Sequence, residues 1–313
     1  MLDNHILIIG GGAIGMPVAK RLAKVLPVTV IRRSHQEIPS EMTDAPLNMI
    51  SGDMTILESI TPIIQKIRPT IILICVSPSE YAESAYRKIY VTGTRNIIQA
   101  IDAAQYLPKK VIFVSSTSVY HQNNDEWVNE ETEVVPQGFS GQVLLEAETL
   151  LAQSQFSSTV VRFSGIYGGG RTRLLDQILE GNQSDYSLES YTNRIHESDC
   201  INLLCYLIEL SCKGVSLAPC YLASDSFPTR MGEVFKIIQN SMDNEGIEYP
   251  KKSGKPSTAP KQGIRRAGSK RCSNKAIVET GYEFLYPSCK EGYSEMVRSL
   301  SHQLKKNQPT GGL

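Results

Sequence analysis

The stretch HILIIGGGAIGMPVAKRLAKVLPVTVIRR, residues 5–33, decides the fold of this 313-residue chain. It begins with the apolar run Ile6 to Ile9, passes through a glycine-rich turn, and ends with a second apolar run, Val28 to Ile31. Short continuous apolar runs are typical of parallel strands buried on both faces. The segment between them, from about Ile14 to about Leu26, has apolar residues at helical spacing. We therefore expect a strand, a tight turn, a helix and a second strand.

The turn has the spacing Gly10-x-Gly12-x-x-Gly15, with Ala13 and Ile14 before the third glycine. In a dinucleotide-binding turn, the first glycine allows the sharp bend and the second lets the backbone approach a pyrophosphate. The third lets the helix lie close to the strand. The helix N-terminus would present its amide groups and dipole to the phosphates. A plain tight turn can match the spacing, but the strand–turn–helix–strand context favours a nucleotide site.

The residues after the second strand indicate which cofactor is bound. Arg32 and Arg33 stand there, and the next carboxylate is Glu37. An acidic residue at this position binds the ribose hydroxyls of NAD, whereas arginine accommodates the 2′-phosphate of NADP. The sequence favours NADP(H) over NAD(H). The alternative is that both arginines are simply solvated.

Composition excludes several classes of function. Acidic and basic residues balance at 32 each, so no overall charge attracts nucleic acid or an anionic membrane. No apolar run approaches the length of a membrane span, and the start of the chain lacks the basic region of a signal peptide. The seven cysteines include no Cys-x-x-Cys, and the five histidines show no ligand spacing. We expect a cytoplasmic protein with reduced thiols and no structural metal.

Strand-like and helix-like segments alternate along most of the chain. Further strands are expected at 48–51, 70–76, 110–114, 159–163 and 220–223, and helices at 56–67, 80–106, 140–152, 174–180, 200–210 and 231–240. Such alternation predicts an α/β fold, a doubly wound parallel sheet with helices on both faces. Ligands bind such sheets at the carboxyl ends of the strands. There the chain places Asp53, which is either an adenine contact or an ordinary turn residue, and the hydroxyl-rich run Ser115 to Tyr120.

The pattern changes after about Phe227. Residues 251–271 hold eight lysines and arginines and no acidic residue, with frequent glycine, proline and serine. This stretch is either a mobile solvated loop or a basic flap over a phosphorylated ligand.

Seven landmarks, in order, resemble those of the extended short-chain dehydrogenase/reductases, also called NAD-dependent epimerase/dehydratases. They are Gly10-x-Gly12-x-x-Gly15, Gly52-Asp53-Met54, Val91-Thr92-Gly93-Thr94-Arg95-Asn96, Ser115 to Tyr120, Arg162 to Gly168, Arg194 to Asp199, and Tyr221 to Asp225. The resemblance covers nearly the whole chain. This chain departs from the family pattern at the turn. The family usually has Gly-x-x-Gly-x-x-Gly there, and this chain has Ile9 in place of the first of those three glycines.

The resemblance implies a Rossmann domain and a smaller substrate lobe. The Rossmann domain would comprise residues 1–163, completed by 198–225, and the substrate lobe would comprise 164–197 and 226–313. Asp53 and Met54 would flank adenine, and Phe163 and Ser164 would lie near the nicotinamide. The full set of expected cofactor contacts is Gly10, Gly12, Ala13, Ile14, Gly15, Arg32, Arg33, Asp53, Met54, Val76, Ser77, Ser115, Phe163 and Ser164.

The resemblance breaks at the catalytic pair. Ser116 matches the family's catalytic serine or threonine, but the family's Tyr-x-x-x-Lys becomes Ser140 and Leu144. An aliphatic hydroxyl is a poor acid or base near neutrality, and leucine can neither hold a ribose nor stabilise an anion. This loss resembles an atypical bacterial branch of the family, described as oxidoreductase-like. Ser116, Ser140 and Tyr167 are the catalytic candidates, and His196 is a further proton donor by residue type.

Two functions remain open at this stage. One is an NAD(P)-dependent oxidoreductase or epimerase/dehydratase acting on a small polar substrate, with nucleotide sugars among the candidates. Thr117, Arg171, Arg194 and His196 would bind that substrate, and the bound cofactor could do the chemistry with the protein only positioning the substrate. The other is a catalytically inactive NADP(H)-binding sensor or scaffold. A homodimer through the helices at 80–106 and 140–152 is an option, because family members often pair there.

Overall fold

The computed structural model describes residues 4–33, 47–181, 187–251 and 268–307, and the structural statements below concern these residues. Within them, seven parallel strands form one central sheet in the order β11-β7-β5-β4-β1-β2-β3. Its strands are β1 (Ile6–Ile9), β2 (Val28–Arg32), β3 (Leu47–Ser51), β4 (Ile71–Ile74), β5 (Lys110–Ser116), β7 (Ser158–Phe163) and β11 (Cys220–Ala223). The chain winds outward from β1 in both directions, which confirms the predicted doubly wound α/β fold.

Ten α-helices lie in the described part of the chain. They are α1 (Gly15–Leu22), α2 (Leu57–Ile67), α3 (Glu83–Tyr86), α4 (Gly93–Ala103), α5 (Phe139–Ala152), α6 (Arg173–Leu179), α7 (Glu197–Cys212), α8 (Met231–Glu245), α9 (Lys275–Glu279) and α10 (Cys289–Asn307). Three pairs of short strands supplement the sheet: β6 (Glu126–Val128) with β13 (Lys270–Cys272), β8 (Gly165–Tyr167) with β10 (Arg194–His196), and β9 (Tyr191–Thr192) with β12 (Thr229–Arg230).

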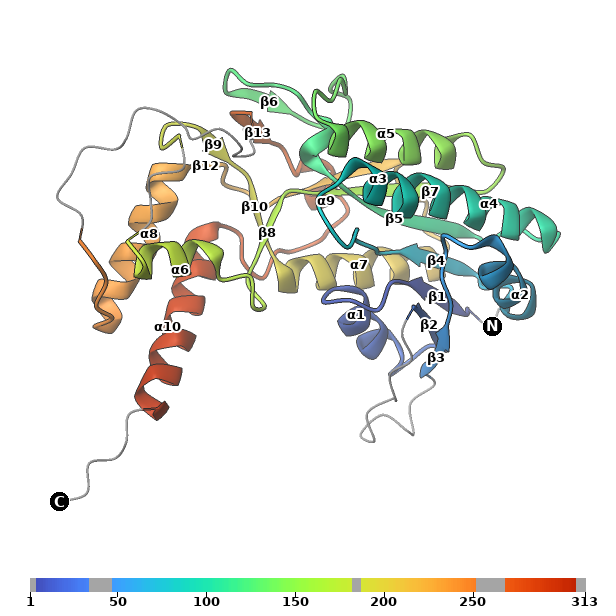
Figure 1. Ribbon diagram of the computed structural model, residues 1–313, viewed down its shortest axis with the longest axis horizontal. Coiled ribbons are helices and arrows are strands. Elements are labelled where there is room, and N and C mark those ends of the chain that lie inside the picture. Colours follow the sequence, from blue (N-terminus) through green and yellow to red (C-terminus); the bar gives the residue numbers. More distant parts are fainter. Residues whose placement is uncertain (1–3, 34–46, 182–186, 252–267, 308–313) are drawn as a thin grey trace.

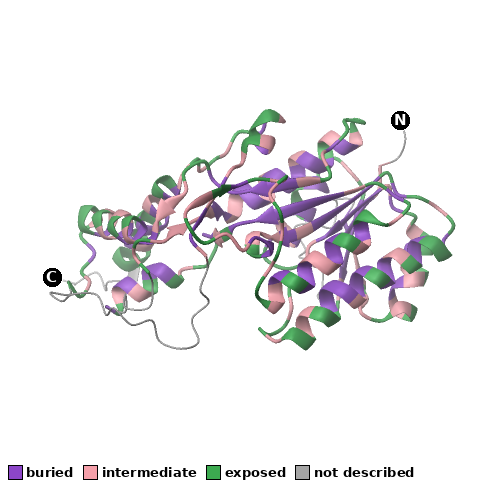
Figure 2. Ribbon diagram, turned by 90° about the horizontal axis from the view of Figure 1, so that it is seen from above, coloured by how far each residue is buried: buried purple, intermediate pink, exposed green. Residues whose placement is uncertain are grey.

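Alternate residues of the central strands supply two hydrophobic cores. Leu7 and Ile9 pack with residues of α2, α4 and α5, whereas Ile6 and Ile8 pack with residues of α1 and α7 on the opposite face. Figure 1 shows α4 and α5 on one side of the sheet and α1 and α7 on the other. The strands are buried, while the helices expose their outer faces (Figure 2). Continuous apolar strands are therefore explained by burial on both faces.

The segment expected to be one helix over 80–106 is instead divided. Helix α3 is followed by a π-helical turn at Arg87–Thr92 and then by α4. A π-helical turn inserts one residue into the α-helical repeat, and such turns occur frequently at functional sites. Apolar residues recur at helical spacing both before and after this π-helical turn, so the sequence pattern does not reveal the one residue that the turn inserts. The helix expected to reach Leu26 ends at Leu22, and β6 lies in a segment for which the sequence predicted no strand.

A separate hydrophobic cluster lies beyond the carboxyl end of the sheet. Helices α6, α8 and α10 contribute to it, with Ile178, Phe235 and Val297 buried at its centre. These helices gather at one end of the molecule, away from α2 and α4 (Figure 1). The arrangement fits a smaller lobe made from 164–197 and 226–313, whose boundaries stay a prediction. Of the basic stretch 251–271, residues 252–267 lie outside the described residues.

Candidate functional site

The three glycines of the Gly-x-Gly-x-x-Gly motif, Gly10, Gly12 and Gly15, have different surroundings. Gly10 has a φ of +106°, and a Cβ there would lie 2.1 Å from the carbonyl oxygen of Cys75. A Cβ on Gly15 would lie 1.9 Å from the carbonyl oxygen of Gly10. A Cβ on Gly12 would meet no described atom within 4 Å. The first and third glycines therefore permit close packing of the chain on itself, whereas Gly12 leaves backbone open to an approaching ligand.

Two adjoining cavities open around this turn at the carboxyl edge of the sheet. The first, of about 200 Å³, is lined by Ile9, Gly10, Gly11, Ile31, Arg32, Arg33, Gly52, Asp53, Met54, Cys75, Val76, Ser77 and Ile89. The second, of about 240 Å³, is lined by Gly12, Ala13, Ile14, Gly15, Cys75, Val76, Ser77, Tyr90, Val114, Ser115, Ser116, Leu144, Phe163, Ser164, Ile166 and Arg171. Cys75, Val76 and Ser77 border both. Between them the two cavities are lined by all fourteen residues that the sequence predicts as cofactor contacts.

The first cavity is bordered by positive charge and by a carboxylate. Arg32 lies across the turn, its Cδ 2.6 Å from where a Cβ of Gly11 would be. Arg33 lies beside it at the end of β2. One carboxylate oxygen of Asp53 accepts hydrogen bonds of 2.8 Å from both the backbone N–H and the hydroxyl of Thr55. Asp53 is thus a turn residue whose other oxygen remains available at the cavity.

The second cavity has serine hydroxyls on a mostly apolar wall. Ser116 Oγ accepts a 3.2 Å hydrogen bond from the backbone N–H of Ser118, so its own proton can be donated to a ligand. Ser164 is buried, and its hydroxyl has no hydrogen-bond partner among the described residues. Leu144, which the resemblance matches with the family's lysine, lies in this wall. The wall can orient a polar ligand but offers no lysine to hold it.

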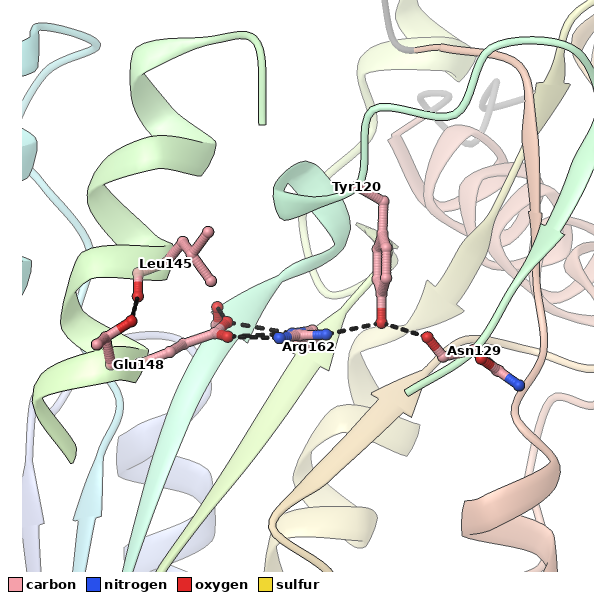
Figure 3. Close-up of polar contacts among 7 residues, drawn as sticks. Tyr120, Asn129, Leu145, Glu148 and Arg162 are labelled. Atoms are coloured by element: carbon pink, nitrogen blue, oxygen red, sulfur yellow. Dashed lines mark hydrogen bonds and ion pairs between the residues drawn. The ribbon is translucent and has the colours of Figure 1, made fainter. Parts of the chain in front are cut away.

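A buried polar network joins Glu148, Arg162, Tyr120 and Asn129 (Figure 3), and it reaches Ser115 in the cavity wall through Glu148. Ser115 Oγ donates a 2.5 Å hydrogen bond to the carboxylate of Glu148, which is paired at 2.6 Å with the guanidinium of Arg162. Arg162 also donates to the hydroxyl of Tyr120, and that hydroxyl donates to the carbonyl of Asn129, both at 2.8 Å. Burial lowers the pKa of Arg162, but the hydrogen bonds and the charge of Glu148 are the main causes that raise it, and the net shift is upward. Because Ser115 commits its proton to Glu148, it can only accept a hydrogen bond from a ligand in the cavity.

Two of the three predicted catalytic residues, Ser140 and Tyr167, line neither cavity, and their catalytic role stays a prediction. Tyr167 is 2 % exposed, and its ring stacks on Tyr293 with 4.5 Å between centroids. Its hydroxyl is 3.5 Å from the carbonyl oxygen of Ser288, and burial raises its pKa far above the usual value. Tyr167 is therefore a packing residue against α10. Ser140, in the first turn of α5, is half-buried and lines neither cavity.

The predicted substrate contacts divide in the same way. Arg171 lines the second cavity and forms an ion pair with Glu197. Thr117, Arg194 and His196 line neither cavity. His196 begins α7, where its Nδ1 accepts a 3.2 Å hydrogen bond from the backbone N–H of Ser198. Burial lowers the pKa of His196, so it is neutral at physiological pH.

Sequence reasoning missed Tyr90 and Ile89, which border the second and the first cavity respectively. Both lie on the π-helical turn. Because the sequence predicted one continuous helix there, it did not predict that these two residues border the cavities. Tyr90 is 8 % exposed, and its hydroxyl donates a 3.3 Å hydrogen bond to the carbonyl of Val76. The glycine turn, the hydroxyl wall and this phenol define the candidate site.

Comparisons with known proteins agree with this architecture. A protein from Methylobacillus flagellatus described as an NAD-dependent epimerase/dehydratase is 33 % identical, with 96 % of this chain and 99 % of that chain covered and a TM-score of 0.75. UDP-glucose 4-epimerase from Thermotoga maritima, solved with UDP-glucose, shares 17 % identity over 96 % and 99 % of the two chains, with a TM-score of 0.74. The Bordetella bronchiseptica enzyme WbmG, solved with NAD and UDP, shares 15 % identity over 96 % and 95 %, with a TM-score of 0.73.

Among curated proteins, no sequence matches this chain significantly. In the described ranges, no helix combines the length and apolar character needed to span a membrane. The model of the NAD dependent epimerase/dehydratase family, however, matches residues 6–184, more than half of the sequence. The chain therefore belongs to the NAD-dependent epimerase/dehydratase family.

Proposed function

We propose that the two cavities together hold one nicotinamide dinucleotide, with NADP(H) preferred over NAD(H). The observation that carries this proposal is the open backbone at Gly12, since the other two glycines of the motif, Gly10 and Gly15, are closed by packing. The adenosine half would lie in the first cavity, beside Asp53 and Met54, with Arg32 and Arg33 facing a 2′-phosphate. The nicotinamide half would lie in the second cavity, beside Phe163 and Ser164. NAD in the WbmG structure supports a nicotinamide cofactor of some kind.

The reaction we propose is that of an oxidoreductase or epimerase/dehydratase acting on a small polar substrate. The cofactor, when bound, would accept or return a hydride. Ser116 would orient the substrate by donating its hydroxyl proton to a substrate oxygen. Ser115 would accept a hydrogen bond from a donor group of the ligand, and Arg171 would bind a negatively charged group of the ligand. A nucleotide sugar is the preferred class of substrate, supported by the UDP-glucose in the Thermotoga epimerase structure.

We further propose a cytoplasmic location and a homodimer that pairs through the surfaces of α4 and α5.

A second function, a dinucleotide-binding sensor or scaffold without catalysis, is favoured by one observation. The wall of the second cavity carries Leu144 instead of lysine, and Ser140 lines neither cavity. On this alternative the cofactor binds, no substrate turns over, and a partner protein binds with different affinity in the presence and absence of NADPH.

Titration of the purified protein with NADPH and with NADH, followed by nucleotide fluorescence, tests the proposal. We expect saturable binding of NADPH and weaker binding of NADH. The protein is then loaded with the oxidised cofactor, NADP+ or NAD+, and mixed with UDP-sugars, and the formation of reduced cofactor is followed at 340 nm in a single turnover, because a sugar hydroxyl that is oxidised to a carbonyl gives its hydride to the cofactor. Binding without any absorbance change across the panel favours the sensor, and binding of neither nucleotide overturns both functions.

A further inference from the structure

Tyr90 is the one tyrosine that lines either cavity in the described part of the chain. Its ring is fixed from two sides, by Tyr86 at 5.6 Å and by Phe113 at 6.2 Å between centroids. The turn that carries it packs against α5, the helix of Leu144, and both residues belong to one hydrophobic cluster. A tyrosine and a leucine therefore stand together in the wall where the family holds its cofactor with lysine.

The hydroxyl of Tyr90 is placed at the junction of the two cavities. It donates to the carbonyl of Val76, a residue that borders both. At 3.3 Å this hydrogen bond is long and therefore weak, so replacing it with a hydrogen bond to a ligand oxygen costs little free energy. Burial raises the pKa of Tyr90 above its usual value, so the phenol keeps its proton and acts as a hydrogen-bond donor. It is unsuited to be the base of a proton transfer.

We infer that the hydroxyl of Tyr90 binds the ribose of the nicotinamide nucleotide. Leu144 has no polar group and cannot hydrogen-bond that ribose, so Tyr90 supplies this contact instead. This inference rests on the proposed function, because it assumes a dinucleotide in the two cavities. The π-helical turn gives the placement its structural basis. It directs Ile89 to the adenosine side and Tyr90 to the nicotinamide side, although the two residues are adjacent in sequence.

A series of ligand fragments tests the inference without a known substrate. The series is 2′-phospho-ADP, 2′-phospho-ADP-ribose and NADPH; if the protein prefers NADH, the same series is used without the 2′-phosphate. Tyr90→Phe removes only the hydroxyl and keeps the ring packed against Tyr86 and Phe113. We expect it to weaken the second and third ligands by about three- to tenfold, the contribution of one hydrogen bond, and to leave the first unchanged. Binding is measured by calorimetry.

Tyr106→Phe is the matched control, because the hydroxyl of Tyr106 is buried without a hydrogen-bond partner among the described residues and lies outside both cavities. It should leave all three affinities unchanged. Unchanged affinities in Tyr90→Phe, an equal loss for all three ligands, or a loss confined to NADPH would each overturn the ribose assignment. Failure of the wild-type protein to bind any of the ligands would instead overturn the proposed function.

Discussion

The carboxylate of Glu148 lies 2.6 Å from the guanidinium of Arg162, and the two side chains are only 6 % and 8 % exposed. The pair connects α5 to β7, and through Ser115 it reaches the wall of the second cavity. Arg162 satisfies both carboxylate oxygens, and Tyr120 accepts its remaining hydrogen bond. Such a network stabilises one arrangement of the cavity wall, provided that every member keeps its partner.

Glu148→Leu should therefore destabilise the protein by about 3–5 kcal/mol, because it leaves the charge of Arg162 buried without compensation. Urea denaturation measures this loss. Arg87→Ala is the control, since Arg87 pairs with Glu83 and Glu146 on an exposed surface, where ion pairs contribute little, and its loss should be much smaller. Equal losses for the two variants would contradict a special role for the buried pair.

The preference for NADP depends on Arg32. Arg32→Ala should lower NADPH affinity by about tenfold or more, because a charge-assisted hydrogen bond to a phosphate is worth roughly 1.5–3 kcal/mol. NADH lacks that phosphate, so its affinity should stay within about a factor of three. Fluorescence titration of both nucleotides checks the ratio. A parallel loss for NADPH and NADH would show that Arg32 supports the turn, on which its side chain lies, rather than the phosphate.

The pH dependence of stability should report Asp225. This carboxyl is 1 % exposed, and burial raises its pKa to about 8. Between about pH 4 and pH 8 the unfolded chain has lost this proton while the folded protein retains it, so this group makes stability fall as pH rises. Asp225→Asn removes the effect. The stability of the variant relative to wild type should increase from pH 5 to pH 8, on the order of a few kcal/mol. Parallel denaturation midpoints across that range would contradict the raised pKa.

The fold was largely predictable because its signals are local. The apolar runs of β1, β2 and β4 and the spacing of Gly10 and Gly15 each follow from neighbouring residues. The lining of the two cavities was predictable for the same reason, because many of its residues follow strand ends whose positions the apolar runs define.

The chemistry of the second cavity was less predictable, because it depends on contacts between distant segments. Nothing near Tyr167 in the sequence shows that α10 will cover its ring, and nothing near Glu148 shows that it will meet Ser115 and Arg162. Tyr90 was concealed by one inserted residue in an otherwise regular helical pattern.

The central claim is that the backbone at Gly12 receives the pyrophosphate of a dinucleotide, and NADPH titration of Gly12→Ala tests it most directly. The added methyl group would meet no described atom within 4 Å apart from its neighbours in the chain, so the variant should fold with wild-type stability and lose NADPH affinity by more than about tenfold. Gly15→Ala is the contrasting variant: its methyl group would strike the Gly10 carbonyl, so it should lose stability itself. A stable Gly12→Ala protein that binds NADPH as tightly as wild type would contradict the account.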